Sequence, residues 1–293
     1  VEAAAHDLVE SGLEGFNDRY RDNDEIGRWA REGAFIIEQH PNHPEYLICE
    51  LETSRGCPYR CSFCTEPMYG DPSFRTTDTV VGEVDALADH GAKHFRLGRQ
   101  ADILAYGGDG EAPNPDALRR LYGGIREVAP DLETLHLDNM NPITIVKWPD
   151  EAREGIRIIA EHNTPGDTAA FGLESADPEV MSDNNLNVTA DECFEAVKIV
   201  NEVAGFRPGG ERDTAPNFDD AARRLPKLLP GINLVHGLKG ERRETFEHNK
   251  RFLQRVYDEG LMLRRVNIRQ VMAFEGTDMA ETGADIAKDH KQL

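Results

Sequence analysis

The stretch YLICELETSRGCPYRCSFC, residues 46–64, joins a β-rich apolar run to a polar loop with three cysteines. The run YLICELE (46–52) predicts a first strand. Cys57, Cys61 and Cys64 follow it with the spacing C-x3-C-x2-C. In folds built on parallel strands, the active site lies at the C-terminal strand ends. The cysteine loop therefore occupies the place where such a fold puts its chemistry.

The chain beyond this loop alternates short β-rich runs with amphipathic segments of helical period, which indicates βα units and a parallel sheet. The further strands are expected at 94–98, 132–137, 168–174, 231–238 and 264–274. Thr77 or Asp78 is the expected N-cap of the first helix, and Gly91 its stop. Six such units with right-handed crossovers predict an α/β fold, a partial (β/α)6 TIM-like barrel with a mostly parallel sheet.

Composition divides the chain into three parts. Residues 1–45 are expected to form a polar, helical leader outside the core, with an extended run at 34–37. Residues 46–280 form the predicted barrel core, which a Pro-, Gly- and charge-rich insertion at 206–230 interrupts. Residues 281–293 are expected to be the tail of a truncated chain, because the sequence begins at Val1 rather than Met.

The chain is strongly acidic, with a net charge of -21, and its basic residues are 8 Lys against 25 Arg. The carboxylates are spread through amphipathic segments, and salt would screen such a surface best, so we expect a halophilic protein. The charge disfavours a nonspecific nucleic-acid surface. No apolar run approaches the roughly 20 residues of a membrane span. We expect a cytoplasmic protein with no membrane partner.

The five cysteines do not form a disulfide framework for a chain of 293 residues, so a reducing compartment is expected. Cys49 and Cys193 lie in apolar periodic runs and are expected to be buried. Three thiolates from one loop suit three corners of a cubane iron-sulfur cluster and leave the fourth iron open. A closed zinc site takes four ligands, and an electron-transfer ferredoxin normally supplies a fourth Cys. A non-catalytic iron-sulfur or zinc-binding module, for electron transfer or as a scaffold, is the alternative interpretation.

The spacing of the three cysteines, with Phe63 directly before the third and a strand before the loop, resembles the radical S-adenosylmethionine (radical SAM) superfamily. The resemblance implies that Cys57, Cys61 and Cys64 hold a [4Fe-4S] cluster and that Phe63 approaches the adenine of S-adenosylmethionine. It further implies reductive cleavage of S-adenosylmethionine to a 5′-deoxyadenosyl radical that abstracts hydrogen from an unknown substrate. An electron donor such as ferredoxin or flavodoxin is the implied partner.

Three later segments extend this resemblance. FGLESADPEVMSDNNLNVTADECFEAV resembles the segment after strand four in the branch with oxygen-independent coproporphyrinogen oxidases, elongator-type acetyltransferases and methylthiotransferases. LVHGLKGERRETFEHN resembles the strand-five signature, with Glu241 as an expected helix cap, although a structural left-handed turn explains its glycines equally well. NIRQVMAFEGTDM resembles the strand-six segment, where only one of Arg269 and Gln270 can face inward. The implied cofactor contacts in these segments are Glu174, Ser175, Gly237, Gly240, Ile268 and Arg269.

The sequence departs from the family pattern after strand two. Many members carry Gly-Gly-Glu there, which binds the methionyl amino group, whereas this chain has LGRQAD at 97–102. Gly98 matches a family glycine, and Arg99, Gln100 or Asp102 is expected to replace the carboxylate unless the contact comes from elsewhere. After strand three, Asp138 and Asn139 are expected to orient the substrate or the ribose, or else to form an Asx-type turn before Pro142.

The chain also resembles an uncharacterised archaeal radical SAM family whose full-length members carry a C-terminal helix-hairpin-helix region. That region is absent from this sequence, and it implies a nucleic-acid substrate, for example in RNA modification. His136 and His236 lie within expected strands and are interpreted as core residues rather than metal ligands.

Overall fold

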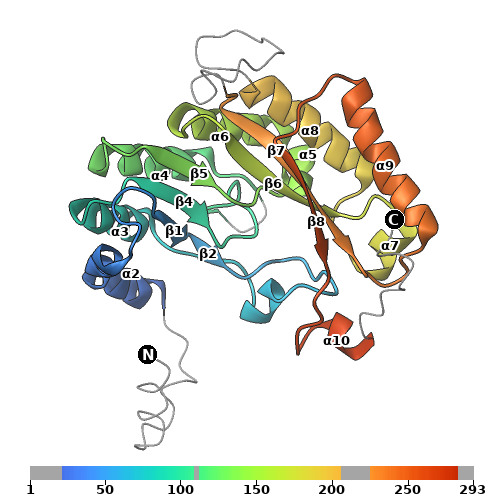
Figure 1. The fold of residues 1–293 in the computed structure, drawn as a ribbon, viewed down its shortest axis with the longest axis horizontal. Coiled ribbons are helices and arrows are strands. Elements are labelled where there is room, and N and C mark those ends of the chain that lie inside the picture. The colour runs from blue at the N-terminus through green and yellow to red at the C-terminus, as the bar shows by residue number, and fades with distance from the viewer. Residues whose placement is uncertain (1–21, 109–111, 206–224, 283–293) are drawn as a thin grey trace, which may run out of the picture.

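The computed structural model describes residues 22–108, 112–205 and 225–282. Within them, the barrel strands follow one another in chain order, and every pairing between neighbours is parallel (Figure 1). An isolated parallel bridge between Asn139 and Ala170 joins the two halves of the barrel wall. The strands are β1 (Ile48–Glu52), β4 (His94–Gly98), β5 (Thr134–Leu137), β6 (Asp167–Glu174), β7 (Leu228–His236) and β8 (Arg265–Gln270). The predicted partial (β/α)6 barrel is confirmed.

Helices cover the outer face of this wall (Figure 1). The helices that follow the strands are α3 (Thr77–Asp89), α4 (Pro115–Val128), α6 (Pro149–His162), α8 (Ala190–Ala204) and α9 (Arg243–Asp258). Shorter elements are α5 (Pro142–Lys147), α7 (Pro178–Asp183), α10 (Asp278–Thr282), η2 (Glu66–Tyr69) and the antiparallel pair β2 (Ser54–Arg55) and β3 (Ser73–Phe74). None of the helices in the described residues is long and apolar enough to cross a lipid bilayer.

The hydrophobic core lies between the strands and these helices, because strand side chains alternate between the two faces. Leu51, Leu97 and Phe171 point outward into the core and are fully buried. The inner face carries polar side chains such as Glu50, Arg96 and Asn233, which remain partly or fully accessible. The inner face of the partial barrel therefore offers accessible polar side chains to a ligand.

The N-terminal part differs from the sequence expectation. Helix α2 (Asn23–Glu32) packs on α3, but residues 34–37 form the 3-10 helix η1 (Ala34–Gln39) rather than an extended run. In a 3-10 helix the side chains at i and i+3 lie one above the other. Ala34 and Ile37 have this spacing and both are buried, so tertiary packing overrides the β-propensity of the run. Residues 1–21, 283–293 and most of the predicted insertion lie outside the described residues.

The expected boundaries are otherwise close. The N-cap of α3 is Thr76, whose side chain accepts from the N–H of Thr79, so the expected Thr77 or Asp78 is wrong by one or two residues. Thr76 keeps an extended backbone, as an N-cap must, whereas Thr77 is already helical. Gly91 has a φ of 89° just past the helix, as predicted. Cys49 and Cys193 are buried, which confirms their assignment to the core.

Helix α8 begins with a capping box that provides a test of the fold. The Thr189 hydroxyl accepts from the N–H of Glu192, and the Glu192 carboxylate accepts from the N–H of Thr189. Replacing such a cap with Ala typically costs about 1 kcal/mol. We expect Thr189→Ala to lower the free energy of unfolding by about this amount in denaturant titration. Thr189→Ser should keep most of the stability, and an Ala variant as stable as the parent would contradict the assigned cap.

Candidate functional site

The base of the cysteine loop is held by the β2–β3 pair. Gly56 leaves β2 with a φ of 84°, and a Cβ there would lie 2.6 Å from the carbonyl oxygens of Gly70 and Asp71. The N–H of Cys57 donates to the Gly70 carbonyl at 3.3 Å. Only glycine fits this close approach of two chain segments. The loop is therefore turned inward before its first cysteine.

The tip of the loop is fixed by Asn184, at the C-terminal end of α7. The N–H of Ser62 donates to the Asn184 carbonyl at 3.0 Å, and the Ser62 hydroxyl donates to the Asn184 Oδ1 at 2.8 Å. The Asn184 amide also donates to the carbonyls of Val180 and Lys239. Asn184 is fully buried. It joins the cysteine loop to the C-terminal half of the barrel.

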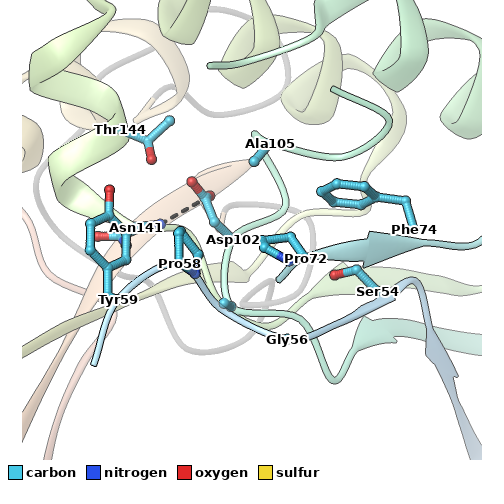
Figure 2. Close-up of a pocket in the computed structure, with 11 residues that line it drawn as sticks. Ser54, Gly56, Pro58, Tyr59, Pro72, Phe74, Asp102, Ala105, Asn141 and Thr144 are labelled. Carbon is cyan, nitrogen blue, oxygen red and sulfur yellow. Dashed lines mark hydrogen bonds between the residues drawn. The ribbon is translucent and has the colours of Figure 1, made fainter. Parts of the chain in front are cut away.

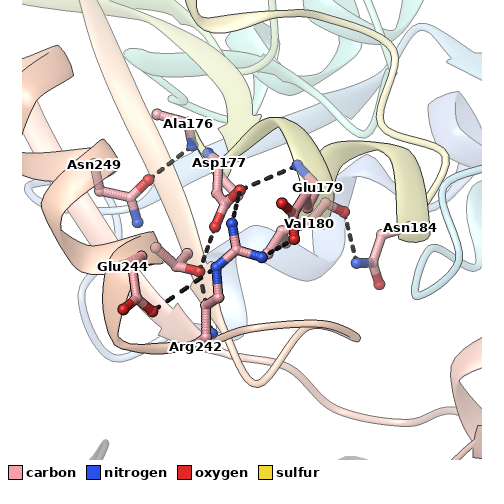
Figure 3. A network of polar contacts seen from close by, with 10 residues as sticks. Ala176, Asp177, Glu179, Val180, Asn184, Arg242, Glu244 and Asn249 are labelled. Carbon is pink, nitrogen blue, oxygen red and sulfur yellow. Dashed lines mark hydrogen bonds and ion pairs between the residues drawn. The ribbon is translucent and has the colours of Figure 1, made fainter.

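The segment that carries Asn184 is itself tied to helix α9 (Figure 3). The buried Asp177 carboxylate accepts from the Thr245 hydroxyl at 2.7 Å and from the N–H of Glu179 at 3.0 Å. Asn249 accepts from the N–H of Ala176 at 2.7 Å, and Arg242 forms ion pairs with both Asp177 and Glu179. The loop that anchors the cysteines is thus held by a buried polar network.

The cysteine loop covers a cavity of about 350 Å³ at the C-terminal ends of the strands. This volume lies within the range of small-molecule sites. Of the residues predicted from the sequence, those that line it are Cys57, Cys61, Phe63, Cys64, Asn139, Glu174 and Arg269. They come from four separate parts of the chain: the cysteine loop, the end of β5, the end of β6 and β8. The structure brings them together around one space, which we call the cysteine pocket.

Burial dominates the electrostatics of the thiols. It raises the pKa of Cys57 to about 11 and that of Cys61 to about 12, and the neighbouring thiols add to the rise. Burial also raises the pKa of the Glu174 carboxyl to about 8, and the charge of Arg269 opposes this shift. Crowded thiols become ligands when bound metal supplies positive charge.

This donor set fits a cubane cluster. The three thiols are free of disulfides and share one cavity, while Cys49 and Cys193 lie in the core away from it. In the parts of the chain that the structure describes, no group of three or more His, Cys, Asp and Glu side chains, the three loop cysteines included, is arranged to hold a metal ion.

The LGRQAD turn directs its candidate side chains away from the lining of the cysteine pocket. Arg99 interacts with Glu52 at 3.4 Å and stacks over the Tyr69 ring at 5.2 Å. Gln100 is buried and donates to the Leu97 carbonyl at 2.9 Å. None of Arg99, Gln100 and Asp102 lines the cysteine pocket; only Ala101 of this turn does so.

Asp102 instead faces a second, smaller cavity behind the cysteine loop (Figure 2). Its Oδ1 accepts from the N–H groups of Leu104 at 3.0 Å and Asn141 at 3.1 Å. Burial raises the pKa of its carboxyl to about 6, although these hydrogen bonds oppose the rise. The cavity is about 20 Å³, enough for one water molecule. Asp102 therefore fastens the β4–α4 loop to the start of α5, outside the cysteine pocket.

Seven predicted contacts do not line the pocket: Gly98, Arg99, Asp138, Ser175, Gly237, Gly240 and Ile268. Asp138 is paired with Arg96, and Ser175 is buried against the N–H of Asp177. Ile268 points to the outer face of β8 and is 61% exposed, because its neighbour Arg269 takes the inner face. The expected Asx-type turn is made by Asn141, the N-cap of α5.

The strand-five glycines belong to a structural turn. Gly237 and Gly240 have φ values of 84° and 79°, and the Glu241 carboxylate closes the turn by accepting from the N–H of Gly237 at 2.9 Å. The N-cap of α9 is Arg242, so Glu241, which was expected to cap this helix through its dipole, lies one residue before the N-cap. His236 stacks on the Phe246 ring, and His136 is largely buried in β5; neither lines the cysteine pocket.

Sequence reasoning missed Glu66, Asn187 and Asn233, which also line the pocket. Glu66 follows Cys64 by two residues, and Asn233 takes an inward position in β7. Period-two alternation along β7 was the signal for Asn233.

A larger cavity of about 690 Å³ lies between α7, α8 and α9, but no cysteine lines it. Leu186 lines both cavities.

Known proteins share sequence with most of this chain. Residues 51–253, more than half of the chain, match the family model of the radical SAM superfamily. An uncharacterised protein of Methanocaldococcus jannaschii is 44% identical over 305 residues, which cover 100% of this chain and 53% of that protein. A ribosomal protein uS12 methylthiotransferase of Phocaeicola vulgatus is 24% identical and covers 78% of this chain and 45% of its own length.

A solved structure shares the fold. Coproporphyrinogen III oxidase of Escherichia coli, described as a radical SAM enzyme, has a TM-score of 0.52 at 15% identity, covering 89% of this chain and 52% of its own. At this identity the likeness concerns the fold alone. The chain spans about half the length of the curated relatives it matches.

The anchoring by Asn184 leads to a prediction with a matched control. Asn184→Ala removes the hydrogen bonds to Ser62 and Lys239, so we expect a loss of about 1–3 kcal/mol in stability together with poor retention of iron by the cysteine loop. Unfolding titration and iron analysis after anaerobic reconstitution measure the two effects.

Asn201→Ala is the control, because Asn201 is also buried and bridges Val197 to Met262 but does not line the cysteine pocket. It should lose similar stability but retain iron. Equal iron retention in the two variants would contradict the anchoring role of Asn184.

Proposed function

Because the chain belongs to the radical SAM superfamily, we propose that its cysteine pocket binds a [4Fe-4S] cluster and S-adenosylmethionine and that the protein is a radical enzyme. The superfamily uses both cofactors. Together they supply a 5′-deoxyadenosyl radical that abstracts hydrogen from the substrate. The observation that supports this function best is the convergence of the three loop thiols on one cavity at the C-terminal strand ends.

The pocket residues have distinct proposed tasks. Cys57, Cys61 and Cys64 hold three irons, and Phe63, in the same loop, flanks the adenine. Glu174, half-buried at the end of β6, accepts hydrogen bonds from the ribose or amino groups. Arg269 is the pocket's cation and faces the carboxylate of S-adenosylmethionine. These assignments use only residues that line the cavity.

We further propose that Glu66 binds the ammonium group of S-adenosylmethionine. Its Oε2 is buried and has no hydrogen-bond partner among the described residues, while its Oε1 lies 4.0 Å from the Arg99 guanidinium. A buried carboxylate oxygen without a donor is costly unless a ligand supplies one. Glu66 lines the cysteine pocket, and the LGRQAD side chains expected for this role do not.

The substrate, the electron donor, the cellular location and the adaptation to salt are narrower proposals. A ferredoxin or flavodoxin is the proposed electron donor. RNA modification remains a prediction from sequence resemblance alone. The methylthiotransferase relative is named for a ribosomal protein and not for RNA. Cytoplasmic location and adaptation to salt also remain predictions. The competing function is a non-catalytic iron-sulfur or zinc-binding module, which the same three thiols suit.

Anaerobic reconstitution with iron and sulfide separates the two functions. We expect the dithionite-reduced protein to show a cubane absorption spectrum that shifts on adding S-adenosylmethionine, and to release 5′-deoxyadenosine. Tight stoichiometric zinc without nucleoside release would favour the non-catalytic module. Cys61→Ala should lose the cluster, whereas Cys193→Ala, in the core, should keep it. Full iron content in the Cys61 variant would show that the ligand assignment is wrong.

The role of Glu66 predicts a loss of affinity that depends on the ligand's amino group. A hydrogen bond between charged groups contributes about 1.5–3 kcal/mol, so Glu66→Gln should weaken S-adenosylmethionine binding by roughly 10- to 100-fold in calorimetric titration of the reconstituted protein. The deaminated analogue should bind the parent and Glu66→Gln equally.

Glu50→Gln is the matched control, because Glu50 faces the barrel interior but does not line the cysteine pocket. It should bind S-adenosylmethionine as the parent does. A Glu66→Gln variant that weakens the natural ligand and the deaminated analogue alike would exclude the ammonium contact.

A further inference from the structure

The inner face of β8 carries a polar strip made of Arg265, Asn267 and Arg269. The strand register places Arg265 beside Gly231, Asn267 beside Asn233 and Arg269 beside Val235. Arg269 and Asn233 line the cysteine pocket. The strip therefore starts at the pocket and runs toward the N-terminal ends of the strands, along the last strand of the described wall (Figure 1).

Arg265 lies across the barrel interior at the far end of this strip. A Cβ on Gly231 would lie 3.1 Å from the Arg265 Cγ, 3.5 Å from its Nε and 2.6 Å from the Thr168 Cγ2. The side chain thus rests over Gly231 in the direction of β6, in space that the missing side chain leaves open. Next along the strip, the Asn267 amide donates to the Asn233 Oδ1 at 3.0 Å, which fixes the orientation of both amides.

Of the two arginines Arg96 and Arg265 on the inner face, only Arg96 has an ion-pair partner among the described residues. Arg96, on β4, forms ion pairs with Asp138 and with Glu50. Arg265 has no ion pair or hydrogen bond from its side chain to any residue in the described parts of the chain, and it is exposed. An unpaired guanidinium inside the barrel of a chain with a net charge of -21 suits an anionic group brought by a ligand.

The length of the strip limits what binds there. Four residues of strand separate the Cα atoms of Arg265 and Arg269 by about 13 Å, and the Arg265 side chain points across the wall toward β6 rather than along β8. In this arrangement a single small ion does not contact both guanidinium groups. A ligand that reaches from Arg265 to the cysteine pocket must be elongated. It must also offer polar groups to the Asn233 and Asn267 amides midway.

Building on the proposed radical function, we propose that the substrate is an elongated low-molecular-weight organic anion that lies along the β8 strip, in place of the RNA that sequence resemblance implies. Its phosphate or carboxylate group binds Arg265, its polar middle contacts Asn233 and Asn267, and the carbon that loses hydrogen lies at the cysteine pocket. Arg265 is then a specificity-determining residue that selects an anion at a fixed distance from the reaction centre.

Binding of two probe anions tests this proposal. Reconstituted protein saturated with S-adenosylmethionine is titrated with inorganic pyrophosphate and with citrate in a calorimeter, at low ionic strength. We expect at least one anion to bind the parent and Arg265→Gln to weaken that binding tenfold or more. Pyrophosphate alone indicates a phosphate group on the substrate, and citrate alone a carboxylate. Arg243→Gln, an exposed change on α9, should leave binding unchanged.

Three results would overturn the proposal: no binding of either anion, equal binding by the parent and Arg265→Gln, or tight binding of oligouridylate alone that depends on Arg265. An Arg265→Lys variant should retain part of the affinity. This result would show that the loss in Arg265→Gln comes from the missing charge rather than from misfolding. The same titrations on protein without cluster or S-adenosylmethionine separate the anion site from the radical function. Anion binding that persists in that protein supports the Arg265 site even if the radical function is wrong.

Discussion

The arrangement of the site depends on holding the cysteine loop at both ends. At its base, Gly56 passes so close to the carbonyls of Gly70 and Asp71 that no side chain fits. At its tip, Ser62 is bonded to Asn184, which also binds the Lys239 carbonyl of the β7–α9 loop. A three-cysteine loop can present its thiols to one ligand only when both ends are fixed. The rest of the pocket forms around this constraint.

Alternation along the strands separates stability from function. Outward side chains such as Leu51, Leu97 and Phe171 form the core under the helices, and the inner face carries accessible polar side chains such as Glu50, Arg96 and Asn233. The same strands therefore carry a buried face that stabilises the barrel and an accessible face that binds ligands. Ala170 and Gly172 on β6 leave room at the cysteine pocket, and Gly231 on β7 leaves room for Arg265.

Periodicity predicted the barrel and the loop position, because strand alternation and helix amphipathicity are local properties of the sequence. The contacts within the pocket were harder to predict, since they depend on which neighbour a turn residue finds. Arg99 turns toward Glu52 and Tyr69, and Glu241 accepts a hydrogen bond within the Gly237 turn, partners that local sequence patterns do not indicate. Glu66 belonged to no expected motif, and two structural observations point to it: it lines the cysteine pocket, and its buried Oε2 has no hydrogen-bond partner among the described residues.

The central claim is that three thiolates leave one iron of a cubane cluster open for S-adenosylmethionine. Mössbauer spectroscopy of protein reconstituted with iron-57 tests it directly, with spectra recorded before and after the ligand is added. We predict that one iron in four changes its isomer shift and quadrupole splitting when S-adenosylmethionine binds, while the other three keep theirs. Four irons that all stay unchanged, or a protein that takes up zinc in place of a cluster, would contradict the claim.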